Sequence, residues 1–103
     1  MYITTNKTQS TLYTGVTNNL SQRIIEHYIN RGTPKSFAGK YHCYNLLYFE
    51  IFQYVEDAIR REKQIKGYSR QKKLELIKNE NPKFIFQNAD VLGCWPPKEN
   101  QQK

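Results

Sequence analysis

Residues 11–28, TLYTGVTNNLSQRIIEHY, place a strand pattern, a glycine and a helix pattern in immediate succession. Polar and apolar side chains alternate over the first six positions, which predicts a half-buried strand. Asn18 or Asn19 can then cap a helix that we expect from Leu20 to about Asn30. A chain of 103 residues is expected to form one domain, and this order of elements favours helices packed on a sheet.

The other elements are expected to complete a small α/β sandwich of one domain. Residues 1–5 are β-prone and are expected to form a hairpin with the strand described above, and the aromatic segment 46–52 is expected to form a third, central strand. Two further helices are expected over 55–66 and from Ser69 to about Lys78. The predicted fold is therefore a three-stranded mixed or antiparallel sheet flanked by three helices.

Composition marks the loops, the tail and the compartment. Residues 33–45 contain proline, serine, glycine and asparagine, so we expect a surface loop there. The chain becomes polar toward its end, and we assign 1–86 to the domain and 87–103 to a polar C-terminal tail. The sequence has no long apolar run and no secretory leader, and Cys43 and Cys94 are too far apart to form a zinc motif. We therefore expect a cytoplasmic protein with reduced thiols and no membrane contact.

The first long helix carries charged groups on the face where core residues should lie. A buried stripe follows positions i, i+3, i+4, i+7 and i+8. In this helix these positions hold Leu20, Arg23, Ile24, His27 and Tyr28. An unpaired charge at a buried position is costly, so Arg23 and His27 are expected to pair, to face a cleft or to hold a ligand.

The second helix repeats the anomaly with a carboxylate. Its stripe holds Val55, Ala58, Ile59, Glu62 and Ile65, so Glu62 is expected to point inward. One explanation is a structural salt bridge between Arg23 and Glu62. The other is a functional site, because arginine binds phosphate through a fork of donors and a lone carboxylate can hold Mg²⁺ while waters and substrate oxygens complete its shell.

These residue types together suit phosphodiester hydrolysis. A metal polarises the phosphate and an arginine offsets the developing charge. His27 lies one turn after Arg23, where it can bond a phosphate or transfer a proton. A group that activates water is also needed, and Tyr2 and Tyr13 on the hairpin are the candidates. Tyrosine has a pKa of about 10, so either would need a nearby cation or metal to act as a base at neutral pH.

Basic residues are unevenly distributed along the chain. Sixteen Lys and Arg against nine Asp and Glu give a net charge of +7, which suits a polyanionic partner. Seven basic residues fall within the fourteen positions 60–73, and we interpret them as a nucleic-acid-binding surface, with a merely solvated helix face as the alternative. These residues, called the basic cluster below, are Arg60, Arg61, Lys63, Lys66, Arg70, Lys72 and Lys73.

In order, spacing and type, several of these residues resemble the signature of the GIY-YIG nuclease superfamily, and the chain is similar to its small single-domain bacterial branch. The matching residues are Tyr2, Tyr13-Thr14-Gly15, Arg23, His27 and Glu62. The resemblance extends to about Phe84, and Asn81, or else Asn79, matches the late asparagine of the family. The first tripeptide is incomplete, because only Met1 precedes its tyrosine. Either the first strand is short, and a short edge strand would hold the tyrosine loosely, or the natural start lies upstream of Met1.

The resemblance implies a role for each matching residue. Tyr2 and Tyr13 would lie near the attacking water, Arg23 would stabilise the phosphate, and Glu62 would bind the metal, Mg²⁺ or Mn²⁺. His27 would be a polar neighbour of Arg23, and Asn81 would also belong to the catalytic set. Gly15 would let the substrate or the following helix approach closely.

Two functions are compatible with these residues. The first is a divalent-metal-dependent endonuclease that hydrolyses DNA phosphodiester bonds, selects DNA by structure rather than by sequence, and acts in DNA repair or processing. The second is a catalytically weak or inactive nucleic-acid-binding module that retains the fold. RNA stays open as a partner, as does the choice between Tyr2 and Tyr13 as the base. A monomer is expected, with a dimer as the alternative.

Overall fold

The computed structural model describes residues 1–97 of the chain, in which three strands form one antiparallel sheet in the order β2-β1-β3. β1 (Tyr2–Thr5) lies between β2 (Leu12–Gly15) and β3 (Asn45–Phe49). The predicted hairpin and the antiparallel pairing are confirmed. β1 is the central strand rather than an edge, so Tyr2 is held firmly and is only 1% exposed.

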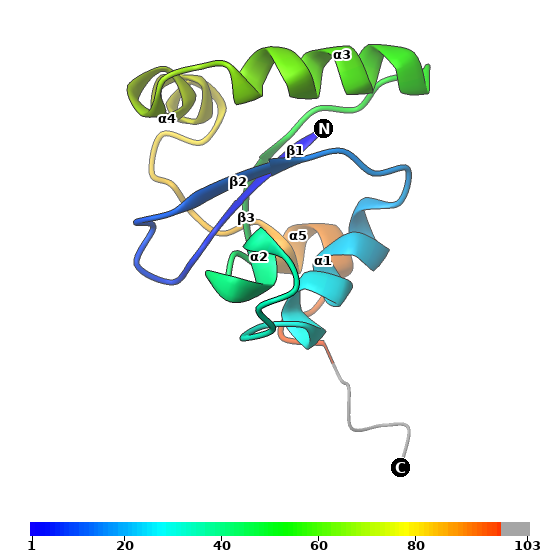
Figure 1. Ribbon diagram of the computed structural model, residues 1–103, viewed down its shortest axis with the longest axis vertical. Coiled ribbons are helices and arrows are strands. Elements are labelled where there is room, and N and C mark those ends of the chain that lie inside the picture. The colour runs from blue at the N-terminus through cyan, green and yellow to red at the C-terminus, as the bar shows by residue number, and fades with distance from the viewer. Residues whose placement is uncertain (98–103) are drawn as a thin grey trace.

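Helices cover both faces of this sheet (Figure 1). α3 (Val55–Lys66) and α4 (Arg70–Glu80) lie on one face. The other face carries α1 (Leu20–Ile29), α2 (Phe37–Lys40) and α5 (Asn88–Leu92). α1, α3 and α4 are the three predicted helices, and the two short ones were not predicted.

The helix ends follow from local chemistry, as the sequence indicates. The Asn19 side chain accepts a hydrogen bond from the backbone N–H of Gln22 at the start of α1. Ser69 accepts one from the N–H of Lys72 in the same way at the start of α4. Each cap satisfies a donor that a helix leaves unpaired in its first turn.

The two helical layers give the domain two apolar cores, one on each face of the sheet. The core beneath α3 and α4 is built from Met1, Ile3, Leu47, Tyr48, Ile65 and Ile77. The core beneath α1 is built from Tyr2, Ile24 and Leu46, with Leu20, Phe49 and Trp95 packed against it. Alternation along β1 sends Tyr2 to one core and Ile3 to the other.

Two asparagines fix the outer side of β3. Asn81 donates from its amide to the carbonyl oxygens of Leu47 and Ile85, at 3.0 and 2.8 Å. Asn88 accepts from the backbone N–H of Leu46 at 2.7 Å. A buried amide that satisfies backbone groups in this way replaces a fourth strand at the edge of the sheet.

Three segments differ from the sequence prediction. The predicted central strand 46–52 is β3, which ends at Phe49 and lies at the edge of the sheet, and residues 50–54 form a loop. The expected surface loop 33–45 contains α2, because Ser36 caps it by accepting from the N–H of Gly39. The expected polar tail begins with α5, whose Asn88 is buried, so residues 88–95 pack on the domain. Residues 98–103 of the predicted tail lie outside the described residues. Among the helices described, none has the length and apolar character that crossing a membrane requires.

Candidate active site

Tyr2 and Tyr13 meet on the sheet face that α1 covers. Tyr2 pairs with Gly15 and Thr4 pairs with Tyr13, so both tyrosines project from the same face. Their ring centroids are 6.1 Å apart. A Cβ at position 15 would lie 2.5 Å from the Tyr2 hydroxyl oxygen, so only glycine leaves room for this ring. The space predicted to admit substrate or a helix is filled by Tyr2 itself.

His27 joins the two tyrosines from α1. Its Nε2 and the Tyr2 hydroxyl form a hydrogen bond of 2.9 Å, and its ring meets Tyr13 edge-on with centroids 5.5 Å apart. His27 is 8% exposed, and burial, aided by the positive charge of Arg23, lowers its pKa to about 4. Burial and the neighbouring Tyr13 raise the pKa of Tyr2 above its ordinary value. At neutral pH this buried pair is therefore uncharged.

Arg23 lies one turn before His27 and keeps its head group in contact with solvent. Its side chain is 43% exposed, and its Nε lies 3.5 Å from a carboxylate oxygen of Glu26. The predicted alternative of a structural salt bridge between Arg23 and Glu62 is wrong, because α1 and α3 pack on opposite faces of the sheet (Figure 1). A half-exposed guanidinium beside neutral ring groups is well placed to receive a phosphate.

Glu62 approaches the same edge of the sheet from α3. Its side chain is 10% exposed, and one carboxylate oxygen lies 2.5 Å from the Lys66 ammonium. That ion pair raises the pKa of Lys66. The predicted stripe on this helix is correct for Ala58, Glu62 and Ile65, which are buried. It is wrong for Val55, which is exposed and borders a surface hollow instead of the sheet, and for Ile59, which is also exposed.

Electrostatic interactions link Glu62 and Lys66 of α3 to the β1–β2 hairpin and to Met1 at its start. Burial lowers the pKa of the Met1 amine, and Glu50 and Glu62 act in the opposite direction. Tyr13 likewise contributes to the raised pKa of Lys66. The set Tyr2, Tyr13, Arg23, His27 and Glu62, called the tyrosine site below, therefore surrounds the β1–β2 hairpin from both sides.

Comparison with known proteins decides what kind of domain carries this set. Residues 1–75 match the family described as the GIY-YIG catalytic domain. The chain belongs to this family. The match includes every member of the tyrosine site, and a GIY-YIG domain implies a nuclease-like function and binding to nucleic acid. No solved structure matches the chain.

Its relatives are small bacterial proteins that carry the name UPF0213. One from Pediococcus acidilactici is 41% identical over 69 residues, which are 67% of this chain and 70% of the relative. Another, from Staphylococcus aureus strain Mu3, is 39% identical over 67 residues, which are 65% of this chain and 79% of the relative. The GIY-YIG assignment and the size of the relatives agree with the predicted branch of the superfamily.

GIY-YIG domains typically use a divalent metal, and the donors present fit one in a limited way. Within residues 1–97 no three histidine, cysteine, aspartate or glutamate side chains gather into a metal-binding group. Mg²⁺ needs no such group, since one or two carboxylates suffice when waters and substrate phosphates supply the other ligands. Glu62 is a single carboxylate at the surface end of a nearly buried side chain, which fits this type of site.

Asn81 does not join the tyrosine site. Both ends of its amide are bonded to backbone, because it donates to Leu47 and Ile85 and accepts from the N–H of Ile85 at 3.0 Å. The residue closes α4 and fixes it to β3. Asn79, the alternative, is exposed on α4. The contacts of Asn81 are those of a residue that positions the sheet.

The basic cluster divides into internal partners and exposed charges. Arg61 donates to both carboxylate oxygens of Glu50, at 3.0 and 3.1 Å, and Lys66 pairs with Glu62. Arg60 pairs with Asp57, and Lys72 lies over the ring of Tyr68. Arg70 donates to the Gln9 carbonyl and lines a shallow hollow with Lys73. Lys63 is exposed.

Sequence reasoning missed the roles of two residues at the site. The basic cluster predicts DNA contact for Lys66, but the spacing of four residues between Glu62 and Lys66 on a helix also indicates an ion pair, which the structure contains. Glu50 was not singled out, yet it binds Arg61 and Tyr48 and lies beside the Met1 amine. Burial opposes ionisation of Glu50, but these bonds outweigh it and hold its pKa below the ordinary value. No local sequence pattern predicts the contact between Glu50 and Arg61.

Proposed function

We propose that this protein is a divalent-metal-dependent endonuclease that hydrolyses DNA phosphodiester bonds. The observation that carries the proposal is the packing of Tyr2, Tyr13 and His27 into one group beside the half-exposed Arg23, within a GIY-YIG catalytic domain. Glu62 completes the set as the proposed metal ligand. The proposed substrate is DNA, selected by structure rather than by sequence, and the proposed setting is DNA repair or processing in the cytoplasm.

The two tyrosines lie in different environments, which supports a different role for each. The Tyr2 hydroxyl is buried and bonded to His27, and its raised pKa disfavours the phenolate. Tyr13 is only partly buried at the sheet edge, near Lys66. We assign the contact with the attacking water to Tyr13, and we assign Tyr2 and His27 to holding the Tyr13 ring in place. A neutral His27 serves that purpose because it accepts or donates a hydrogen bond without repelling Arg23.

Arg23 is the proposed phosphate ligand. Its planar fork can donate two bonds to a phosphate and offset the negative charge that grows as the P–O bond breaks. Mg²⁺ or Mn²⁺, when bound to Glu62, supplies positive charge that polarises a phosphate oxygen and acidifies water. Lys66 occupies the same carboxylate in the structure, so it would exchange its bond with Glu62 for one with the DNA backbone.

The deciding test is nicking of supercoiled plasmid, and cleavage of flap, splayed-end and single-stranded DNA, with Mg²⁺ or Mn²⁺. Glu62→Gln and Arg23→Gln are each expected to lower the rate by about 10²–10³-fold, the usual effect of removing a group that stabilises transition-state charge. Glu56→Gln is the matched control, since Glu56 is exposed on the same helix as Glu62. Thermal unfolding of each variant separates lost catalysis from lost folding.

A second pair of variants tests the assignment of the tyrosines. Tyr13→Phe should lower the cleavage rate with little loss of stability, while Tyr2→Phe should lower stability more because it leaves His27 without its partner. If wild-type protein binds these DNAs and cuts none of them with either metal, the endonuclease proposal is wrong and the chain is a binding module that retains the fold.

A further inference from the structure

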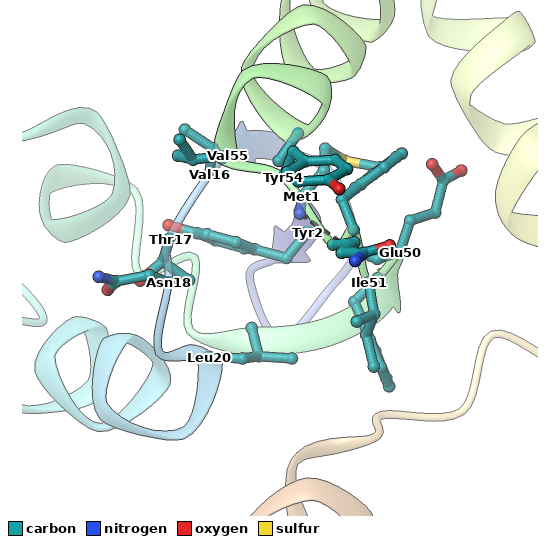
Figure 2. A pocket seen from close by; sticks show the side chains of 14 residues that line it. Met1, Tyr2, Val16, Thr17, Asn18, Leu20, Glu50, Ile51, Tyr54 and Val55 are labelled. Atoms are coloured by element: carbon teal, nitrogen blue, oxygen red, sulfur yellow. Dashed lines mark hydrogen bonds between the residues drawn. The ribbon is translucent and has the colours of Figure 1, made fainter.

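An open hollow adjoins the tyrosine site at the ends of β1 and β3. Its volume is about 320 Å³, and it lies between the first turn of α1, the start of α3 and the loop 50–54. Its walls include Met1, Tyr2, Leu20, Phe49 and Val55. Figure 2 shows Tyr54 and Val55 on one side of the hollow, Leu20 on the opposite side, and the Tyr2 side chain between them. We call this feature the loop hollow.

Large apolar side chains are exposed around the loop hollow. Ile51 is 86% exposed, Tyr54 is 60% exposed and Val55 is 58% exposed, and all three line it. Ile59 is also exposed one turn further along α3. A soluble domain gains nothing for its own folding from apolar groups held in water, and a group of them around a concavity marks a binding site.

The rim of the loop hollow also carries side-chain amides. Asn18 and Gln53 are exposed members of its lining, and Asn18 lies at its outer edge in Figure 2. An amide presents a donor and an acceptor together, which is the arrangement that base edges recognise. The aromatic ring of Tyr54 offers a stacking surface on the same rim. The loop hollow therefore combines apolar walls, one exposed ring and polar amides at its edge. This combination suits a flat heterocycle, which has apolar faces and a polar edge, better than a sugar or a lipid chain.

Continuity with the tyrosine site indicates where such a heterocycle would come from. Tyr2 lines the loop hollow and bonds His27, and the helix that begins at Leu20 carries Arg23 one turn later. A strand whose phosphate lies on Arg23 therefore has a neighbouring base within reach of the hollow. A base that is paired within a duplex cannot enter, because its edge and faces are already occupied.

We propose that the loop hollow receives an unpaired nucleobase next to the scissile phosphate, with Tyr54 as the stacking residue and Ile51 as an apolar wall. This inference rests on the proposed endonuclease function and gives it a physical source of structural selectivity. Flaps, splayed ends and single strands supply an unpaired base without cost, and an intact duplex must first be opened there. Stacking on an aromatic ring tolerates any base, so selection by structure needs no sequence preference.

Binding without metal tests the inference separately from catalysis. Oligonucleotides with 2-aminopurine at the last unpaired position of a flap report stacking through fluorescence quenching, and anisotropy gives the affinity for flap and duplex. Tyr54→Ala and Ile51→Ser are expected to weaken flap binding about tenfold or more and to abolish the quenching, with duplex affinity unchanged. Both side chains are largely exposed, so neither variant should unfold the domain. Tyr41→Ala is the control, since Tyr41 is exposed outside the loop hollow.

The possible results lead to different conclusions. Equal flap-to-duplex ratios in wild type, Tyr54→Ala and Ile51→Ser would overturn the base-binding role, while cleavage by all three proteins would leave the endonuclease intact. Failure of wild type to bind or cut any DNA would remove the proposed function itself. A concentration-dependent dimer in sedimentation that Ile51→Ser dissolves would assign the hollow to a second copy of the chain and also overturn the inference.

Discussion

Gly15→Ala tests whether the packing around Tyr2 organises the site. A Cβ at this position would lie 2.5 Å from the hydroxyl oxygen of Tyr2, 2.6 Å from its Cζ and 3.0 Å from a ring carbon of Tyr13. Carbon atoms prefer separations of about 3.5–4.0 Å, so the Tyr2 ring would have to move by about 1 Å. Tyr2 is almost fully buried and pairs with strands on both sides, which leaves it no direction in which to move.

The expected magnitudes follow from that geometry. Overpacking of this kind costs about 1–3 kcal/mol, against about 0.4–1 kcal/mol gained because alanine restricts the unfolded chain. The variant should therefore be less stable, and each net kcal/mol should lower Tm by about 4–8 °C in a domain of this size. A displacement of about 1 Å should also weaken the Tyr2–His27 bond and slow cleavage by about 10²-fold.

Differential scanning fluorimetry and plasmid nicking measure the two effects on the same samples. Gly67→Ala is the matched control, because its nearest contact would be an ordinary 3.4 Å from the Gln64 carbonyl oxygen and its backbone is αR. That variant should equal or slightly exceed wild type in stability. Gly15→Ala with an unchanged Tm and rate would refute the reasoning, since Tyr2 would then have room that the geometry denies it.

Three further predictions concern single side chains. Burial holds the pKa of His27 at about 4 in the folded state, against 6.5 in the unfolded chain. The contribution of His27 to the free energy of unfolding should therefore be constant above pH 6.5 and fall by at most about 3 kcal/mol toward pH 4. Urea titrations at several pH values measure this slope, and His27→Gln should remove it. Thr14→Val should raise the free energy of unfolding by about 1–3 kcal/mol, because the buried Thr14 hydroxyl has no hydrogen-bond partner within the described chain. A lower free energy of unfolding in this variant would show that the hydroxyl is in fact bonded. Arg61→Gln should lower the free energy of unfolding by about 1–3 kcal/mol, because it removes the bonds to Glu50. Lys63→Gln should change the free energy of unfolding by less than about 0.5 kcal/mol and lower DNA affinity in anisotropy titrations. Equal stabilities of the two variants would contradict the division of the basic cluster.

The parts of the fold that local chemistry determines could be predicted from the sequence. α3 has the bounds expected from its acidic first turn and from Gly67, and Asn19 and Ser69 cap the helices assigned to them. α2 and α5 were missed because helices of four and five residues leave little periodicity to detect. Both are held by contacts remote in sequence, such as the bond between Asn88 and the backbone of β3.

The pairing of charged groups was harder to predict than their location. The inward positions of His27 and Glu62 follow from helical spacing and are confirmed. The groups that His27 and Glu62 contact depend on which face of the sheet each helix covers. Helical spacing carries no information about the face that a helix covers. For the same reason the sequence left Arg23 and Glu62 as a possible pair, while in the structure the sheet separates them.

The central position of β1 has a consequence for synthesis of the chain. β1 is made first, but its partner Phe49 leaves the ribosome much later, about 2–9 s at ordinary rates of translation. Until then Tyr2 has only the hairpin partner Gly15, and a two-stranded hairpin alone is marginally stable in water. Nascent chains should therefore expose the apolar side chains of their first strand for several seconds, and the sheet should close only when the third strand arrives.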